Sequence, residues 1–115
     1  MDALARQKIQ DLQILEQNLQ SLLVQKQNLQ ADLNETVNAL EEVKKTNDSV
    51  YKMVGSIIVV VDKKKTLDEL EEKKKLSELR SDSISKQENL IESKARELQQ
   101  EIKKLLENKS PTTSK

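Results

Sequence analysis

The 115-residue chain contains no histidine, cysteine, tryptophan or phenylalanine. It has one aromatic residue, Tyr51, one glycine, Gly55, and one proline, Pro111. Without histidine or cysteine it offers no imidazole base, no thiol nucleophile and no ordinary set of zinc ligands. The lack of cysteine also excludes a disulfide framework, which fits a reducing compartment. We therefore expect binding rather than enzymatic catalysis, with no metal site and no cofactor.

Net charge and long apolar runs are also missing. The 20 basic and 20 acidic residues give a formal net charge of zero. The longest uninterrupted apolar run, at 57–61, is far too short to span a bilayer, and the N-terminus lacks the basic-then-apolar order of a signal peptide. Acidic residues separate the lysine triplets at 63–65 and 73–75, and aromatic residues for base stacking are lacking, which argues against nucleic acid. The sequence predicts one soluble, cytoplasmic domain without membrane or nucleic-acid partners.

Helical periodicity dominates what is present. In the first stretch, positions spaced alternately by three and four are mostly apolar; they are Leu12, Leu15, Leu19, Leu22, Lys26, Leu29, Leu33, Thr36, Leu40 and Val43. This is the heptad pattern of a coiled coil. It predicts a helix at about 2–46, followed by a short polar loop.

A second helix is predicted at about 66–108, before a tail at 110–115 that we expect to be disordered. Thr66 and Glu69 have the spacing of a capping box, which predicts that the helix starts there. The apolar stripe comprises Leu67, Leu70, Leu76, Leu79, Ile84, Leu90, Ile91, Ala95, Leu98, Ile102 and Leu105. Its phase slips between Leu70 and Ile84, which predicts a stutter in the coiled coil.

The segment between the helices has a different composition and predicts a β-hairpin at about 50–61. Its two strands are apolar and rich in β-branched residues, and Gly55-Ser56 between them is a two-residue turn with positive φ at the glycine. The expected pairing runs from Val54 with Ile57 to Val50 with Val61. The oligomerisation residues predicted here are Val50, Tyr51, Met53, Val54, Gly55, Ile57, Ile58, Val59, Val60 and Val61.

Both faces of this hairpin are mainly apolar, which has a consequence for assembly. An isolated two-stranded hairpin is marginal in water, and open apolar strand edges promote aggregation. The helices extend as a coiled coil and can cover little of it. We therefore expect an obligate oligomer built through the hairpin, in which strands from several subunits cover one another.

A hairpin between two helices of nearly equal length predicts that they fold back antiparallel, with both chain ends at the far tip. Apolar side chains gather there and are only partly buried by one another, because helix ends fray. They form the predicted substrate-binding tip: Leu4, Ile9, Leu12, Leu98, Ile102, Leu105 and Leu106. The fold class is thus mainly α, a long antiparallel two-helix coiled coil with a β-hairpin linker.

At this point the residues resemble the β class of prefoldin subunits. The hairpin at 50–59 is similar to the family's VYK-VG-ILV core, and further similarities lie at Asp62-Lys63, Asn34-Glu35, Ala39–Glu42, Leu79-Arg80 and Lys86–Glu88. A single hairpin and a short chain are similar to the β class rather than the longer α class. The resemblance covers nearly the whole chain.

The resemblance implies a hexamer of two α-type and four β-type subunits, assembled through a double β-barrel that the hairpins build. It implies an ATP-independent chaperone, a holdase, which binds unfolded polypeptides at the coiled-coil tips and delivers them to a group II chaperonin. The alternative is a structural coiled-coil adaptor or scaffold with one dedicated partner. The hairpin discriminates between them, because a scaffold coil needs no apolar strand pair at its bend.

Overall fold

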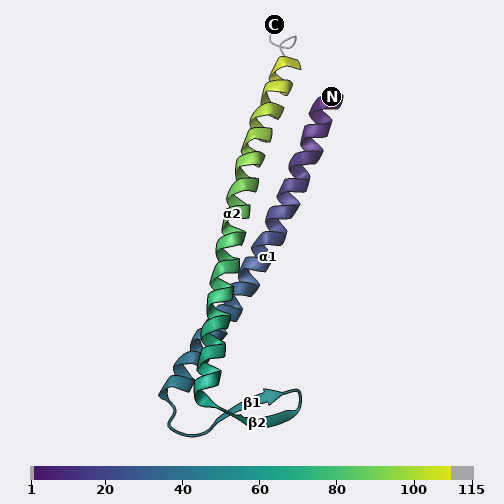
Figure 1. Ribbon diagram of the computed structural model, residues 1–115. Helices are drawn as coiled ribbons and strands as arrows, with labels where there is room; N and C mark the ends of the chain where they lie inside the picture. The colour runs from purple at the N-terminus through teal and green to yellow at the C-terminus, as the bar shows by residue number, and fades with distance from the viewer. Residues whose placement is uncertain (1, 110–115) are drawn as a thin grey trace. The chain divides into compact units, whose positions relative to one another are not determined.

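The computed structural model describes residues 2–109. The elements follow one another in the order α1 (Ala3–Lys45), β1 (Val50–Val54), β2 (Ile57–Val61) and α2 (Lys63–Lys109) (Figure 1). The fold is therefore mainly α, with two long helices and a short antiparallel hairpin between them, as predicted. The tail expected to be disordered, at 110–115, lies outside the described residues.

The chain divides into two compact units. The first comprises Met1–Gln25 and Ser83–Lys115, of which 2–25 and 83–109 are described. The second comprises Lys26–Asp82 and contains the hairpin with the helix segments on either side of it. That the whole chain is a single domain stays a prediction.

The first helix begins at a capped residue. The backbone N–H of Leu4 donates to Oδ1 of Asp2 over 3.0 Å, and the N–H of Arg6 donates to the Asp2 carbonyl over 3.1 Å. Asp2 is therefore the N-cap of α1, a position that aspartate favours. The helix ends at Lys45, and the hydroxyl of Thr46 accepts from the N–H of Asp48 in the following loop. These bounds lie within one residue of those predicted.

The second helix begins three residues before the predicted start. The carboxylate of Asp62 accepts from the N–H of Lys65 over 2.9 Å, and the Asp62 carbonyl accepts from the N–H of Thr66 over 3.0 Å. Asp62 is therefore the N-cap, and the capping box predicted at Thr66 is wrong. Asp62 follows β2 directly, so its side chain satisfies the free N–H groups of the first turn before the chain reaches Thr66.

The predicted seam of α1 is confirmed. All ten of its positions from Leu12 to Val43 are buried or half-buried, and Leu22 and Leu40 are 7% and 4% exposed. Thr36 is the most deeply buried of them, at 2% exposure, and its hydroxyl donates to the Asp32 carbonyl over 2.8 Å. Because that hydroxyl is satisfied within the helix, a polar residue is tolerated in the seam.

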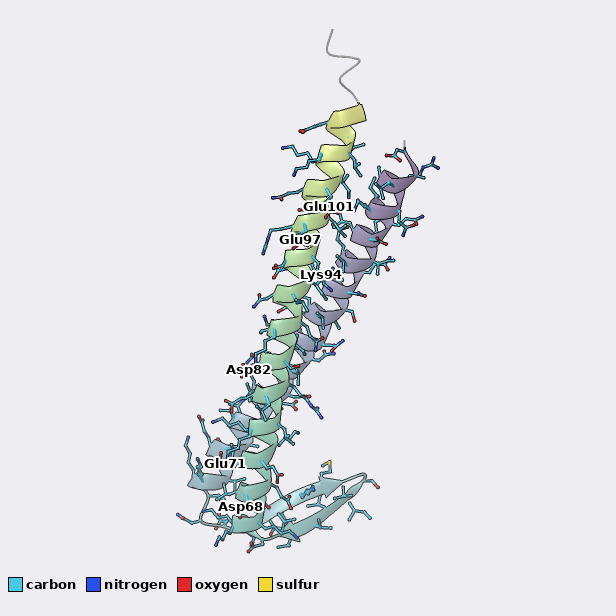
Figure 2. All side chains as sticks on the ribbon, turned by 45° about the horizontal axis from the view of Figure 1, so that its top comes forward. Asp68, Glu71, Asp82, Lys94, Glu97 and Glu101 are labelled. Carbon is cyan, nitrogen blue, oxygen red and sulfur yellow. The ribbon has the colours of Figure 1, made fainter. Side chains whose placement is uncertain are left out.

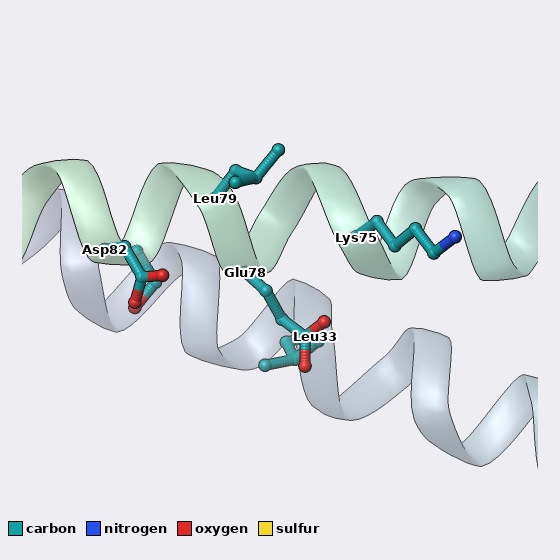
Figure 3. A pocket seen from close by; sticks show the side chains of 6 residues that line it. Leu33, Lys75, Glu78, Leu79 and Asp82 are labelled. Carbon is teal, nitrogen blue, oxygen red and sulfur yellow. The ribbon is translucent and has the colours of Figure 1, made fainter.

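The seam of α2 runs without a break, so the predicted stutter is wrong. Positions spaced alternately by three and four are all buried or half-buried: Leu67, Leu70, Lys74, Ser77, Ser81, Ile84, Glu88, Ile91, Ala95, Leu98, Ile102 and Leu105. Leu76, Leu79 and Leu90, which were assigned to the stripe, are 50–65% exposed. Leu79, though mostly exposed, lines a surface cavity together with Leu33 of α1 (Figure 3). The serines occupy the seam, and the leucines beside them face solvent.

The hairpin has the predicted register. Val50 pairs with Val61, Tyr51 with Val60, Lys52 with Val59, Met53 with Ile58, and Val54 with Ile57. Gly55 has a φ of 62°, and no other described residue has positive φ. Positive φ at the first turn residue alone defines a type II′ turn, whose twist matches that of the flanking strands.

Candidate interaction surfaces

The hairpin exposes nearly all of its apolar side chains. Exposed fractions are 61% for Tyr51, 70% for Met53, 63% for Ile58 and 68% for Val60. Figure 2 shows side chains standing off both sides of the hairpin. Of the predicted oligomerisation residues, only Val50 and Val61, next to the helices, are half-buried. The described chain therefore leaves an apolar two-sided sheet uncovered.

The register assigns each strand residue to one of two faces, because paired residues share a face and successive residues alternate. We call one the tyrosine face; it consists of Tyr51, Met53, Ile58 and Val60. We call the other the lysine face; it consists of Val50, Lys52, Val54, Ile57, Val59 and Val61. The two faces differ in one respect, namely that only the second contains a charge.

A cavity of about 430 Å³ lies between the hairpin and the helix segments of the same unit. Val43, Val61 and Leu70 contribute apolar surface to it, and Lys52 and Glu69 contribute charges. Lys52 and Glu69 also line an adjacent cavity of about 410 Å³. Local sequence patterns do not reveal these cavities, because the cavities depend on the angle at which the hairpin leaves the helices.

The predicted tip residues all lie in the first unit, where the start of α1 runs beside the end of α2. Leu4 is 53% exposed and Leu106 is 42% exposed. The other five are half-buried: Ile9, Leu12, Leu98, Ile102 and Leu105. These positions thus combine partial burial with remaining apolar exposure. Their contact with a substrate stays a prediction.

Two features of this unit were missed at the level of sequence. Ala5, near the start of α1, is 1% exposed. The ammonium of Lys8 forms an ion pair with the carboxylate of Glu101, a residue 93 positions later. Only the paired helices bring these two charges together, and single-sequence periodicity does not reveal which charges meet.

Residues 2–109 contain no group of three or more acidic side chains placed to hold a metal ion. Within the same range, neither helix has an apolar stretch long enough to cross a membrane. The surfaces that remain as candidates for function are the uncovered hairpin and the half-buried apolar helix ends.

Comparison with known proteins gives a consistent match. A family model described as "Prefoldin subunit" matches residues 6–109. The prefoldin β subunit of Archaeoglobus fulgidus is 38% identical over 100 residues, which cover 85% of this chain and 86% of that protein. The β subunits of Thermococcus onnurineus and Pyrococcus furiosus are 41% and 44% identical over 70 residues, or 59% of this chain. In these last two cases the match covers 60% of the relative's own length.

The structural comparison agrees with the sequence match. The crystal structure of the prefoldin β subunit from Thermococcus strain KS-1 superposes with a TM-score of 0.83 and 33% sequence identity. The superposition covers 91% of this chain and 94% of that one, so it extends over nearly the whole length of both. Because the family model covers almost all described residues and the relatives are β subunits, this chain belongs to the prefoldin family, in its β class.

Proposed function

We propose that the chain is the β-type subunit of a hexameric, ATP-independent holdase chaperone. Membership of the prefoldin family implies a chaperone subunit rather than an enzyme. The observation that carries the proposal is that the chain leaves two separate apolar surfaces uncovered. One is the hairpin, and the other is the pair of helix ends in the first unit.

The hairpin is the assembly surface in this proposal. Its strands are apolar on both faces, and an uncovered two-stranded sheet is marginal in water. Hairpins from other subunits supply the missing strands and close into a β-barrel, which removes open strand edges. Following the family, the proposed composition is two α-type and four β-type subunits.

The helix ends are the proposed binding surface for unfolded polypeptides. Leu4 and Leu106 are about half exposed beside half-buried neighbours, so each helix pair offers a small apolar contact. Each such contact is weak, and six of them in one assembly raise the overall affinity through effective concentration. The bound polypeptide is then passed to a group II chaperonin, in the cytoplasm.

The proposal is tested by separating binding from assembly. Leu4→Ser combined with Leu106→Ser removes exposed apolar surface at the helix ends, and it is expected to abolish suppression of aggregation of several unrelated denatured proteins. Ile14→Ser is the matched control, since Ile14 is 54% exposed in the same unit but lies farther along α1. Native mass spectrometry should find the same hexamer for both variants.

Two results would contradict the proposal. If the double variant suppresses aggregation as well as Ile14→Ser does, the helix ends are not the binding surface. If the wild-type chain protects a single partner and no unrelated denatured protein, the adaptor alternative is correct.

A further inference from the structure

Lys52 is the only charged residue in the two strands, and it stands in the middle of the lysine face. It pairs with Val59 and is flanked on the same face by the Val50–Val61 and Val54–Ile57 pairs. All of its neighbours on that face are therefore apolar. Any sheet that covers this face would remove the ammonium from water together with them.

The charge of Lys52 is unpaired within the part of the chain that the structure describes. Among residues 2–109, no carboxylate forms an ion pair with the Lys52 ammonium. Glu69 lines two cavities together with Lys52, and Asp62 lines one of them, yet neither carboxylate forms an ion pair with Lys52. A charge that is buried without a partner strongly destabilises the interface that buries it.

A second copy of this chain cannot supply the missing carboxylate from its strands. Residues 50–61 contain no acidic residue, and the nearest ones are Asp48 and Asp62, outside the paired region. A copy laid over the lysine face would therefore present apolar side chains or another lysine. Inward-pointing charges of this kind are a known means of preventing unwanted strand association.

The tyrosine face carries no such restriction. Its four side chains carry no charge and are 61–70% exposed, so an apolar sheet, including one from another copy, can cover it without burying a charge. The two faces of one hairpin thus differ in the partners that they accept.

We propose that Lys52 selects the partner that covers the lysine face. The favoured partner is a β-strand from a different subunit type, apolar but with one carboxylate positioned opposite Lys52. The inference rests on the proposed assembly through the hairpin. It adds the requirement that the partner strand supplies a carboxylate to Lys52. Charge complementarity decides between partners here because the surrounding surface is uniformly apolar and does not discriminate.

The test measures self-association and partner binding with the same variants. Tagged wild-type chain, Lys52→Met and Lys52→Arg are each purified alone and with the longer subunits that co-purify with the wild type. For Lys52→Met, sedimentation velocity should show self-association at least about tenfold tighter and partner binding at least about tenfold weaker. Lys52→Arg should behave as the wild type, and so should Lys64→Met, which removes an exposed charge on α2.

The decisive result is that Lys52→Met changes self-association and partner binding in opposite directions. If Lys52 only supports the hairpin, both associations change in the same direction, which overturns the inference. If Glu69→Gln weakens partner binding as strongly as Lys52→Met does, the counter-charge is intramolecular and the inference is wrong. If the wild type binds no second subunit type while Ile58→Lys leaves its oligomer intact, the proposed function itself fails.

Discussion

The ammonium of Lys63 donates a 2.8 Å hydrogen bond to the backbone carbonyl of Thr46. Lys63 is the first residue of α2, and Thr46 directly follows α1, so the bond joins the two ends of the segment that contains the hairpin. The Thr46 carbonyl is one of the groups that a helix C-terminus leaves without an intrahelical partner. A cation at this point also complements the negative end of the α1 dipole.

Lys63→Met is therefore expected to loosen the base of the hairpin. The bond is partly buried and involves a charged donor, so its loss should lower the free energy of unfolding by about 1 kcal/mol. Thermal unfolding of the isolated chain, followed by circular dichroism, measures the change. Lys65→Met serves as the control, because only the backbone N–H of that residue is used at the helix start. Equal melting temperatures for the two variants would contradict the assigned role of Lys63.

The start of α2 gives a second prediction. Asp62→Ala removes the side chain that accepts from the N–H of Lys65, and loss of an N-cap costs about 1 kcal/mol. Thr66→Ala removes the residue that the sequence pattern assigned as the cap, and its effect should be smaller than 0.5 kcal/mol, roughly that of an ordinary surface substitution. Urea unfolding of both variants at one protein concentration compares them directly. A larger loss of unfolding free energy for Thr66→Ala than for Asp62→Ala would indicate that the helix starts at position 66.

The position of the α2 seam gives a third prediction. Leu70 lies half-buried in the seam, whereas Leu79 is 65% exposed. Leu70→Ala should therefore destabilise the second unit by about 1–2 kcal/mol, since it removes packed methyl groups. Leu79→Ala should change stability by less than about 0.5 kcal/mol. Hydrogen exchange of the amides at 26–82 measures the stability of this unit separately. Similar losses of stability from both substitutions would favour the predicted stutter over the continuous seam.

Assembly through the hairpin gives a fourth prediction. Ile58 is 63% exposed at the centre of the tyrosine face, opposite Met53. Ile58→Lys should leave the helices folded but prevent the hexamer from forming, because a charge would enter the apolar barrel. Leu90→Lys is the control, since Leu90 is 60% exposed on α2, outside the hairpin. A native mass spectrum with intact hexamer for Ile58→Lys would show that assembly uses another surface.

Sequence patterns predicted the elements that depend on local chemistry. The seam of α1 follows from an unbroken heptad, and the register of β1 with β2 follows from the two-residue turn at Gly55. The end of α1 was within one residue, because lysines and a polar loop mark it. In each case a single local rule decided the outcome.

The errors arose where two local rules competed. In α2, Leu76 and Leu79 favoured one phase and Ser77 and Ser81 the other. Hydrophobicity alone selects the leucines, but the flanking seam at Leu70 and Ile84 is continuous only through the serines. The ion pair between Lys8 and Glu101 and the unpaired charge of Lys52 depend on which segments meet in space, and one sequence does not contain that information.

The turn at Gly55 restricts the chirality of the residue at this position rather than the size of its side chain. A Cβ built on this residue would meet no atom within 4 Å, so there is room for a side chain. Its φ of 62° nevertheless lies in a region that L-amino acids enter at a cost of about 1–2 kcal/mol. At the hairpin turn, the backbone angle therefore disfavours an L-residue even though there is space for its side chain. For an amino acid of the opposite hand, the same backbone angle would be the relaxed one.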